Sequence, residues 1–230
     1  MSNEAVESGK NMTREIKTIS LGGVNCYLVK AGDGYILIDT GFSSRRAYLE
    51  KELESAGVVP GNLTLIILTH GDSDHADNCA YLREKYGAPI TMHLDDSGMV
   101  ENGDMSWNRK SKPDKISITF RILTKIFSGL NKSGKFNTFK PDFYIVDGQS
   151  LSEYGFRAEV LHLPGHSKGS IGILTAGGDL FCGDMFYNFA GFTYIDDLAD
   201  YNASINKLKN FKIKTVYPGH GKPFSMRSST

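Results

Sequence analysis

The stretch Thr69-His70-Gly71-Asp72-Ser73-Asp74-His75 decides both fold and site, because it places two imidazoles and two carboxylates within six residues. It follows the apolar run 63–68, which predicts a buried strand bounded by Gly61 and Gly71. Such a strand would deliver the polar side chains to its carboxyl end, where open α/β sheets place their sites. Imidazole nitrogen and carboxylate oxygen are ligands of zinc, iron and manganese. Taken alone, the segment also fits a solvated polar turn, since Asp, Ser and Gly are common turn formers.

The composition predicts one globular domain over residues 1–230, which at this length buries roughly 70% of its unfolded surface. Lys plus Arg and Asp plus Glu number 26 each, so nothing in the charge balance indicates a nucleic-acid partner. No segment is long and apolar enough to cross a bilayer, so we expect no membrane partner. Residues 1–12 are polar, are expected to be disordered and lack the apolar core of a signal peptide. Three widely spaced cysteines, beside apolar segments and without a Cys-x-x-Cys pair, predict buried thiols and a cytoplasmic location.

Strand-like and helix-like segments alternate along the chain, which predicts a mixed α/β layered domain. The dipeptide Asp33-Gly34 joins two apolar runs as a hairpin turn would. Helices are expected near residues 43–56, 76–86 and 201–211.

The segment over about residues 95–140 interrupts this alternation. Residues 101–140 carry nine Lys or Arg and three Asp or Glu, a net charge of +6, around a periodic segment at 116–130 that predicts a helix. A basic helical insertion fits a lid or a partner surface, and it fits a solvated cover without a ligand role equally well.

Three further strand-like runs end in Gly followed by a ligand-type residue. They are Leu161 to His166 with its Pro-Gly-His-Ser, Leu180 to Asp184 with its Gly-Asp, and Val216 to Gly221 with its Pro-Gly-His-Gly. A lone histidine at a strand end is usually structural. Four of the chain's six histidines fall in such places together with Asp, which makes coincidence a poor explanation.

These elements, in this order, resemble the metallo-β-lactamase superfamily, whose pattern is His-x-His-x-Asp-His, a distal His, a bridging Asp and a final His. The opening strands around Asn25-Cys26-Tyr27 and Ile38-Asp39-Thr40-Gly41 resemble the family's first hairpin. The resemblance implies an αβ/βα four-layer sandwich, with two facing sheets, outer helices and a metal centre at one edge.

By this resemblance the centre holds two divalent metal ions. His70 and His166 would hold the first ion, Asp74, His75 and His220 the second, and Asp184 would bridge them. Asp72 departs from the pattern, because it stands where the family has its second His. It would ligate directly, bind through water, or accept a hydrogen bond beside a one-metal site. We favour direct ligation. Zinc is the preferred ion, and the added carboxylate makes iron or manganese competitors.

The ligand set indicates a hydrolase that uses a metal-bound hydroxide on a thioester, lactone or other ester-like bond of a small molecule. Asp74 would also orient the nucleophile. Tyr187 stands three residues beyond Asp184, the offset of a tyrosine that assists lactone opening in the superfamily's acyl-homoserine lactonases, and would bind a developing oxyanion. Its alternative role is in an apolar wall with Phe186 and its aromatic neighbours. His93 and His162 lie off the motif and are expected either to contact the metal ligands from outside or to be structural.

Two other functions remain open at this stage. The first is a diiron-type redox enzyme, an oxygen or nitric-oxide reductase or a dioxygenase, since the superfamily's diiron flavoproteins carry an acidic residue at the place of Asp72. The second is a non-catalytic metal-binding module. The basic segment leaves an anionic substrate open, and the sequence does not determine the oligomeric state.

Overall fold

The computed structural model describes residues 15–119, 121–122, 137–188 and 193–226. Its larger sheet has the order β1-β2-β3-β4-β5-β7. The strands are β1 (Ile16–Ser20), β2 (Asn25–Ala31), β3 (Gly34–Ile38), β4 (Leu63–Ile67), β5 (Ile90–Met92) and β7 (Phe143–Tyr144). The first three strands are antiparallel neighbours, and β3, β4, β5 and β7 pair in parallel. The expected hairpin joins β2 and β3.

The second sheet has the order β13-β12-β10-β9-β8. Its strands are β8 (Ala158–His162), β9 (Ile171–Thr175), β10 (Asp179–Asn188), β12 (Thr215–Gly221) and β13 (Phe224–Ser225). A separate two-stranded pair joins β6 (Lys115–Ile116) to β11 (Tyr194–Ile195).

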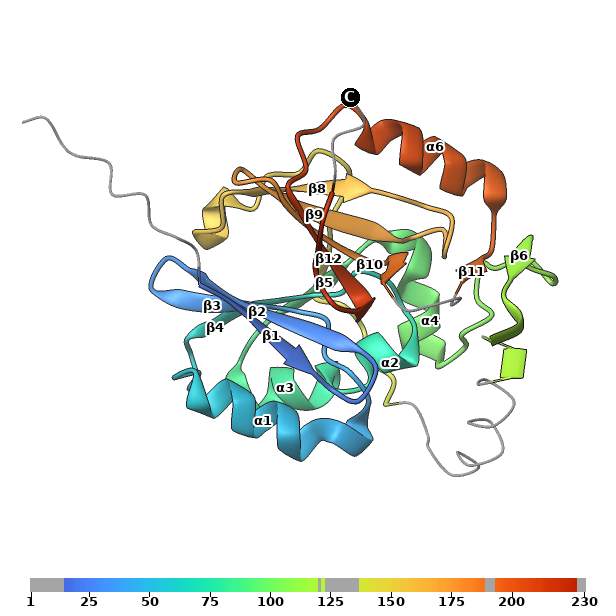
Figure 1. Cartoon of the computed structure of the whole chain (residues 1–230). Coiled ribbons are helices and arrows are strands. Elements are labelled where there is room, and N and C mark those ends of the chain that lie inside the picture. The colour runs from blue at the N-terminus through green and yellow to red at the C-terminus, as the bar shows by residue number, and fades with distance from the viewer. Residues whose placement is uncertain (1–14, 120, 123–136, 189–192, 227–230) are drawn as a thin grey trace, which may run out of the picture.

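Helices cover the outer face of each sheet, as Figure 1 shows for α1 and α3 on one side and α6 on the other. The α-helices are α1 (Arg46–Ser55), α2 (Ser73–Ala76), α3 (Cys79–Tyr86), α4 (Ser97–Asn102) and α6 (Leu198–Leu208). Short 3-10 turns lie at η1 (Ser43–Arg45), η2 (Leu94–Asp96) and η3 (Ser152–Tyr154). The four layers form the αβ/βα sandwich that the sequence predicted.

The hydrophobic core consists of three clusters of buried residues, because strand side chains alternate between the two faces of each sheet. Ile36, Ile38 and Leu65 point into the space between the sheets with residues of β8, β9 and β10. Their neighbours Leu37 and Ile66 belong to the cluster beneath α1 and α3. A third cluster packs α6 against the outer face of the second sheet. β4 is buried on both faces, which explains its unbroken apolar sequence.

Two ligand-type residues lie inside strands, whereas the sequence placed them after strands. β10 runs on from Asp179 through Asp184 to Asn188, and its register against β12 shifts on either side of Gly183. The pairing is therefore irregular around Gly183, but the strand continues through it to Asn188. His220 lies likewise near the end of β12.

The insertion at about 95–140 is described only in part. Its described residues contain α4, the loop 103–114 and β6. Most of the helix expected over 116–130 lies outside the described residues, as does the segment 1–12 expected to be disordered.

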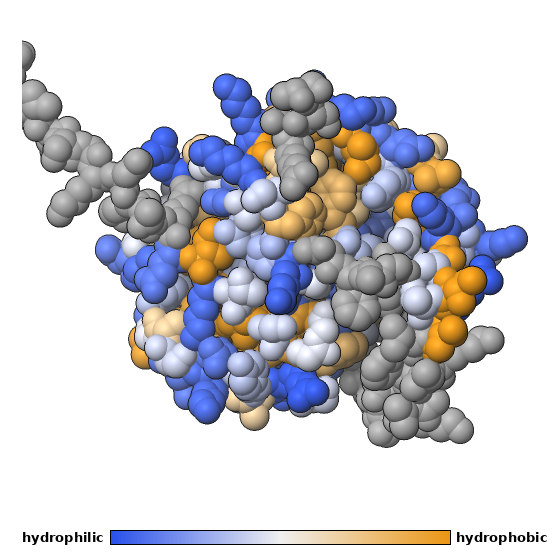
Figure 2. All heavy atoms as spheres, in the orientation of Figure 1, coloured by the Kyte–Doolittle hydropathy of each residue, from blue (hydrophilic) through white to orange (hydrophobic). Residues whose placement is uncertain are grey.

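On the face shown in Figure 2, hydrophilic and hydrophobic residues are interspersed. Within the described part of the chain, no helix has the length and apolar character needed to cross a bilayer. The cysteines Cys26, Cys79 and Cys182 are buried free thiols, as expected.

Candidate metal centre

The structure brings all seven predicted metal-ligating residues together at one edge of the sandwich, between the two sheets. His70 and Asp72 lie in the loop after β4, and Asp74 and His75 lie in the first turn of α2. His166 lies in the loop after β8, Asp184 in β10 and His220 in β12. Three groups of side chains converge closely enough to hold an ion: His70–His75–Asp184, His70–Asp72–His166 and Asp74–His75–His220.

The second metal position has two carboxylates facing two imidazoles. His220 Nε2 lies 3.3 Å from both Asp74 Oδ2 and Asp184 Oδ2, and His75 Nε2 lies 3.3 Å from Asp184 Oδ1. Gly219 permits this approach, because a Cβ there would come within 2.4 Å of Asp184 Oδ1. In this group Asp74 and Asp184 face the imidazoles of His75 and His220, and Asp184 also accepts from the Tyr187 hydroxyl.

Unpartnered buried atoms show that this position fits a cation. His70 Nε2, His75 Nε2 and Asp184 Oδ1 are buried and have no hydrogen-bond partner among the described residues. A buried polar atom without a partner costs about 1–3 kcal/mol. A divalent ion would satisfy nitrogen and oxygen lone pairs together, and these are the donor types that zinc and iron bind. The residues present therefore fit a metal ion at the second position.

The first metal position is built differently, because an arginine contacts it. Arg109 donates from Nη1 to Asp72 Oδ1 at 2.8 Å and from Nη2 to Asp72 Oδ2 at 2.9 Å. Its Nη2 also lies 3.3 Å from His166 Nε2, which itself lies 2.9 Å from Asp72 Oδ2. His70 Nε2 completes the group at 3.4 Å from Asp72. The carboxylate that replaces the second His of the motif is thus already bound to a cation.

A network of outer partners orients the imidazoles. His75 Nδ1 lies 2.9 Å from Asp39 Oδ2, and Asp39 also accepts from the backbone and hydroxyl of Thr69. Asp39 has a φ of 58°, which is unusual for a residue other than Gly and indicates a constrained functional position. His220 Nδ1 lies 2.7 Å from the carbonyl of Gly23. With Nδ1 donating, each Nε2 lone pair is left for a metal.

Asp96 connects the two ligand-bearing loops. It accepts from Ser167 Oγ at 2.6 Å and from Gly169 N at 2.7 Å, and Gly71 N lies 3.2 Å away as a further donor. Asp96 is buried, and so is Ser167. It therefore holds the loop of His70 and Asp72 against the loop of His166.

Tyr187 lies beside the bridging carboxylate. Its hydroxyl donates to Asp184 Oδ2 at 3.1 Å and lies 3.1 Å from His166 Nδ1. Burial and the Asp184 carboxylate raise the pKa of this phenol well above its usual range, so it stays protonated and can donate. Its ring also lines a cavity of about 160 Å³ with Phe186, Tyr194 and Tyr201. Both roles expected for Tyr187, at the site and in an aromatic wall, are therefore sterically available.

Burial and neighbouring charges shift the pKa values of several side chains in the centre, among them His75, His220 and Asp72. Burial lowers the pKa of His75 and His220, but Asp74 and Asp184 outweigh it, raising the pKa of His75 well above its usual range and that of His220 to about 10. Burial raises the pKa of Asp72, but Arg109 and His166 outweigh it and hold that pKa well below its usual range. Burial lowers the pKa of His166. The carboxylates are thus ionised and ready to bind a cation.

The family model of the metallo-β-lactamase superfamily matches residues 19–220, a span that includes every ligand described above. The chain belongs to this superfamily. The superfamily is one of metallo-hydrolases, and its fold generally binds divalent metal ions.

Curated relatives are similar over most of this chain. A β-lactamase-like protein 2 homolog of Caenorhabditis elegans is 26% identical over 205 residues, which cover 88% of this chain and 57% of that protein. The atrochrysone carboxyl ACP thioesterase of Aspergillus fumigatus is 27% identical, and the match covers 88% of this chain and 52% of that protein. The chain spans only about half to three fifths of these relatives. A probable metallo-hydrolase of Methanocaldococcus jannaschii is 28% identical, with 86% and 87% covered.

Solved structures share the superfamily fold. TTHA1623 in a di-iron-bound form superposes with a TM-score of 0.66 at 24% identity, covering 92% of this chain and 94% of that one. BJP-1, a subclass B3 metallo-β-lactamase of Bradyrhizobium japonicum, superposes with a TM-score of 0.67 at 21% identity. The match covers 90% of this chain and 75% of that one.

Two histidines lie apart from the superfamily's motif positions. The rings of His93 and His162 stack with centroids 4.1 Å apart and planes at 6°, beside Asp95. Together with Asp95 they form a further group of side chains whose ligand atoms lie close together, outside the seven predicted ligands. His162 Nε2 also lies 2.7 Å from the carbonyl of Lys168. This pair joins the ends of β5 and β8 across the sheets, in agreement with the structural role expected for it.

Sequence reasoning assigned no role to Asp39, Asp96 or Arg109. Asp39 follows the strand next to β4, so its position at the same sheet edge was a usable signal. Asp96 and Arg109 carried no such signal, because each reaches the centre from the segment after β5 that the motif does not include.

Proposed function

We propose that this chain is a metal-dependent hydrolase of a thioester, lactone or other ester-like bond in a small molecule. The observation that carries the proposal is the convergence of His75 Nε2 and Asp184 Oδ1, buried and unpartnered, with Asp74 and His220 around them. We propose two positions for divalent ions, with zinc preferred and iron or manganese as competitors. A bound ion of this kind activates water and polarises a carbonyl oxygen.

The protein's own residues supply orientation and proton donation. Asp74 Oδ2 lies between His75 Nε2 at 3.8 Å and His220 Nε2 at 3.3 Å, so it can orient a water near them. Tyr187 Oη keeps its proton and can donate to the oxyanion that forms when an ester carbonyl is attacked. The aromatic cavity next to Tyr187 would exclude water from a small acyl group.

The comparisons support a hydrolase of this kind. One relative is named as an acyl-carrier-protein thioesterase, and another as a probable metallo-hydrolase. Thioester and lactone cleavage need the same two elements, an activated water and an oxyanion donor. A bound ion would supply the first, and Tyr187 would supply the second.

The test begins with metal content and identity in protein purified without added metal. Thioester, lactone and phosphodiester substrates are then assayed with and without a chelator. We expect zinc and chelator-sensitive hydrolysis of a thioester or lactone, and loss of both in Asp184→Asn. His93→Ala is the matched control, because it alters a histidine outside the ligand set, and it should retain metal and activity. Iron with oxygen consumption, or bound metal without turnover of any ester, would contradict the proposal.

A further inference from the structure

Arg109 belongs to the metal centre, although no pattern in the sequence assigned it there. Its two terminal nitrogens bind the two Asp72 oxygens at 2.8 and 2.9 Å, and Nη2 lies 3.3 Å from His166 Nε2. It therefore contacts two of the three side chains of the first metal position. Bidentate pairs of this kind are short, directional and charge-assisted.

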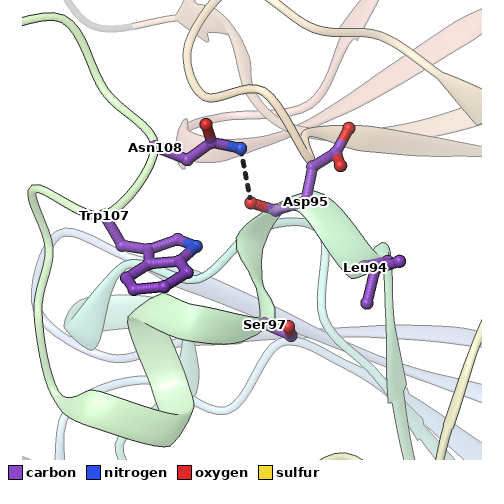
Figure 3. Close-up of a pocket in the computed structure, with 5 residues that line it drawn as sticks. All are labelled: Leu94, Asp95, Ser97, Trp107 and Asn108. Carbon is purple, nitrogen blue, oxygen red and sulfur yellow. Dashed lines mark hydrogen bonds between the residues drawn. The ribbon is translucent and has the colours of Figure 1, made fainter.

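Residues on both sides of Arg109 make contacts that fix the position of its loop, and the loop in turn positions the guanidinium. The Trp107 ring packs directly over Gly98 of α4, where a Cβ would come within 2.1 Å of the indole. Asn108 donates to the carbonyl of Asp95 at 3.2 Å, on the wall of a cavity of about 430 Å³ (Figure 3). The Lys110 backbone N–H lies 3.2 Å from the Asp196 carboxylate.

The Arg109 side chain itself is largely enclosed. It is only 10% exposed, Nη1 donates to the carbonyl of Met105 at 3.1 Å, and the guanidinium carbon lies 5.3 Å from the centre of the Tyr194 ring. The Asp72 side chain is 17% exposed. Because both partners are mostly withdrawn from solvent, their charges are weakly screened.

The two metal positions consequently differ in charge. At the second position, no lysine or arginine of the described residues bonds to Asp74 or Asp184, so two carboxylates face the ion. At the first position Arg109 offsets the charge of Asp72, which leaves the bridging Asp184 as the one carboxylate there without a bonded arginine. A divalent ion there would meet a like charge at close range and an aspartate whose oxygens are already engaged. Arg109 therefore disfavours a second ion at the first position, although His70, Asp72 and His166 lie close enough together to hold one.

We propose that the Arg109 guanidinium serves as a fixed cation at the first metal position, so that the chain binds a single ion tightly at Asp74, His75, His220 and Asp184. A second ion binds only when Arg109 releases Asp72. The proposal rests on the metal centre of the proposed function and is independent of its substrate.

The test measures metal stoichiometry and affinity, not activity. Metal-free protein is titrated with zinc by calorimetry, and metal retained after buffer exchange is counted by elemental analysis. We expect a single tight ion in the wild type and a second ion bound at least about tenfold more tightly in Arg109→Met. Lys110→Met is the matched control, because Lys110 pairs with Asp114 and Asp197 outside the centre, and it should behave as the wild type.

Two further variants keep the result interpretable. Asp72→His combined with Arg109→Met removes the fixed cation and supplies a neutral ligand, and it should also take a second ion. Asp72→Ala combined with Arg109→Met should return to a single ion, because the freed carboxylate is then absent. Two equally tight ions in the wild type, or no gain in folded Arg109→Met and in the folded double variant Asp72→His with Arg109→Met, would overturn the role of Arg109. A wild type that binds no metal would instead refute the metal centre of the proposed function.

Discussion

The two metal positions share one bridging residue and differ in how their carboxylates are satisfied. At the second position Asp74 and Asp184 face imidazoles, and buried atoms of His75 and Asp184 lack a partner among the described residues. At the first position Asp72 is held by Arg109 through two hydrogen bonds. The same ligand pattern can therefore provide one position whose carboxylates lack a lysine or arginine partner among the described residues and one whose carboxylate is already paired with Arg109. The number of ligand-type residues does not by itself determine how many ions bind.

The largest expected effect comes from removing a ligand of the second position. His75→Ala should weaken binding of the tight ion by about 3 kcal/mol or more, an even share of the 10–16 kcal/mol typical of four zinc ligands. His70→Ala should leave that ion nearly as tight. Zinc titration of the metal-free variants measures both. Equal losses in the two variants would contradict the distinction between the positions.

Removing Asp72 should destabilise the metal-free chain, because it leaves the Arg109 charge buried without a partner. We expect a loss of about 3 kcal/mol in the free energy of unfolding for Asp72→Ala, partly restored by adding Arg109→Ala. Urea denaturation in the presence of a chelator measures the free energy of unfolding of both variants. The control is Glu54→Ala, which breaks the ion pair between Lys85 and the exposed Glu54. Its free energy of unfolding should change little. Equal stability of Asp72→Ala and the control would show that the pair is not a structural element.

Asp39→Asn tests the support of the second position. The amide keeps the shape but is a weaker acceptor for His75 Nδ1, so metal affinity should fall about 10–100-fold. Competition with a chromophoric chelator measures the affinity, and Asp196→Asn provides an aspartate control outside the ligand support. An unchanged affinity in Asp39→Asn would remove Asp39 from the centre.

Metal affinity should rise with pH, because the carboxylates raise the pKa of His75 well above its usual range and that of His220 to about 10. Below those values each histidine holds a proton that the ion must displace, so affinity should gain up to about tenfold per pH unit and per histidine. Without metal the sign reverses: these raised pKa values stabilise the fold below about pH 6.5, and that contribution disappears as the histidines lose their protons. Proton release on zinc binding, followed with a pH indicator, checks the first point. Release of no protons near pH 7 would contradict it.

The smallest effect is expected at Tyr187. Tyr187→Phe removes the hydroxyl that donates to Asp184 and keeps the ring in the aromatic cavity. Turnover of the best ester substrate should fall about tenfold, while metal content stays unchanged. Steady-state kinetics and elemental analysis together measure this. Full turnover would leave Tyr187 with the role of an aromatic wall alone.

Local patterns were enough to predict the strand β4, the β2–β3 hairpin and the helices α1, α3 and α6, because apolar residues recur there with the period of a strand or a helix. The seven candidate ligands came from the resemblance to the superfamily's motif. Tertiary structure decided the rest. The register shifts of β10 against β12 depend on a partner distant in sequence, and Asp184 lies within that strand.

The sequence by itself predicted the layered fold, and its resemblance to the superfamily supplied the seven candidate metal-ligating side chains. Only the tertiary structure decided that Arg109, from a loop outside the motif, binds Asp72 and makes the two metal positions unequal. The physical reason is that an ion pair depends on the distance between charges in space. The contact between residues 72 and 109 cannot be predicted from periodicity or spacing. It depends on the position of the loop that carries Arg109, where Trp107 packs on Gly98 and Asn108 donates a hydrogen bond to the carbonyl of Asp95.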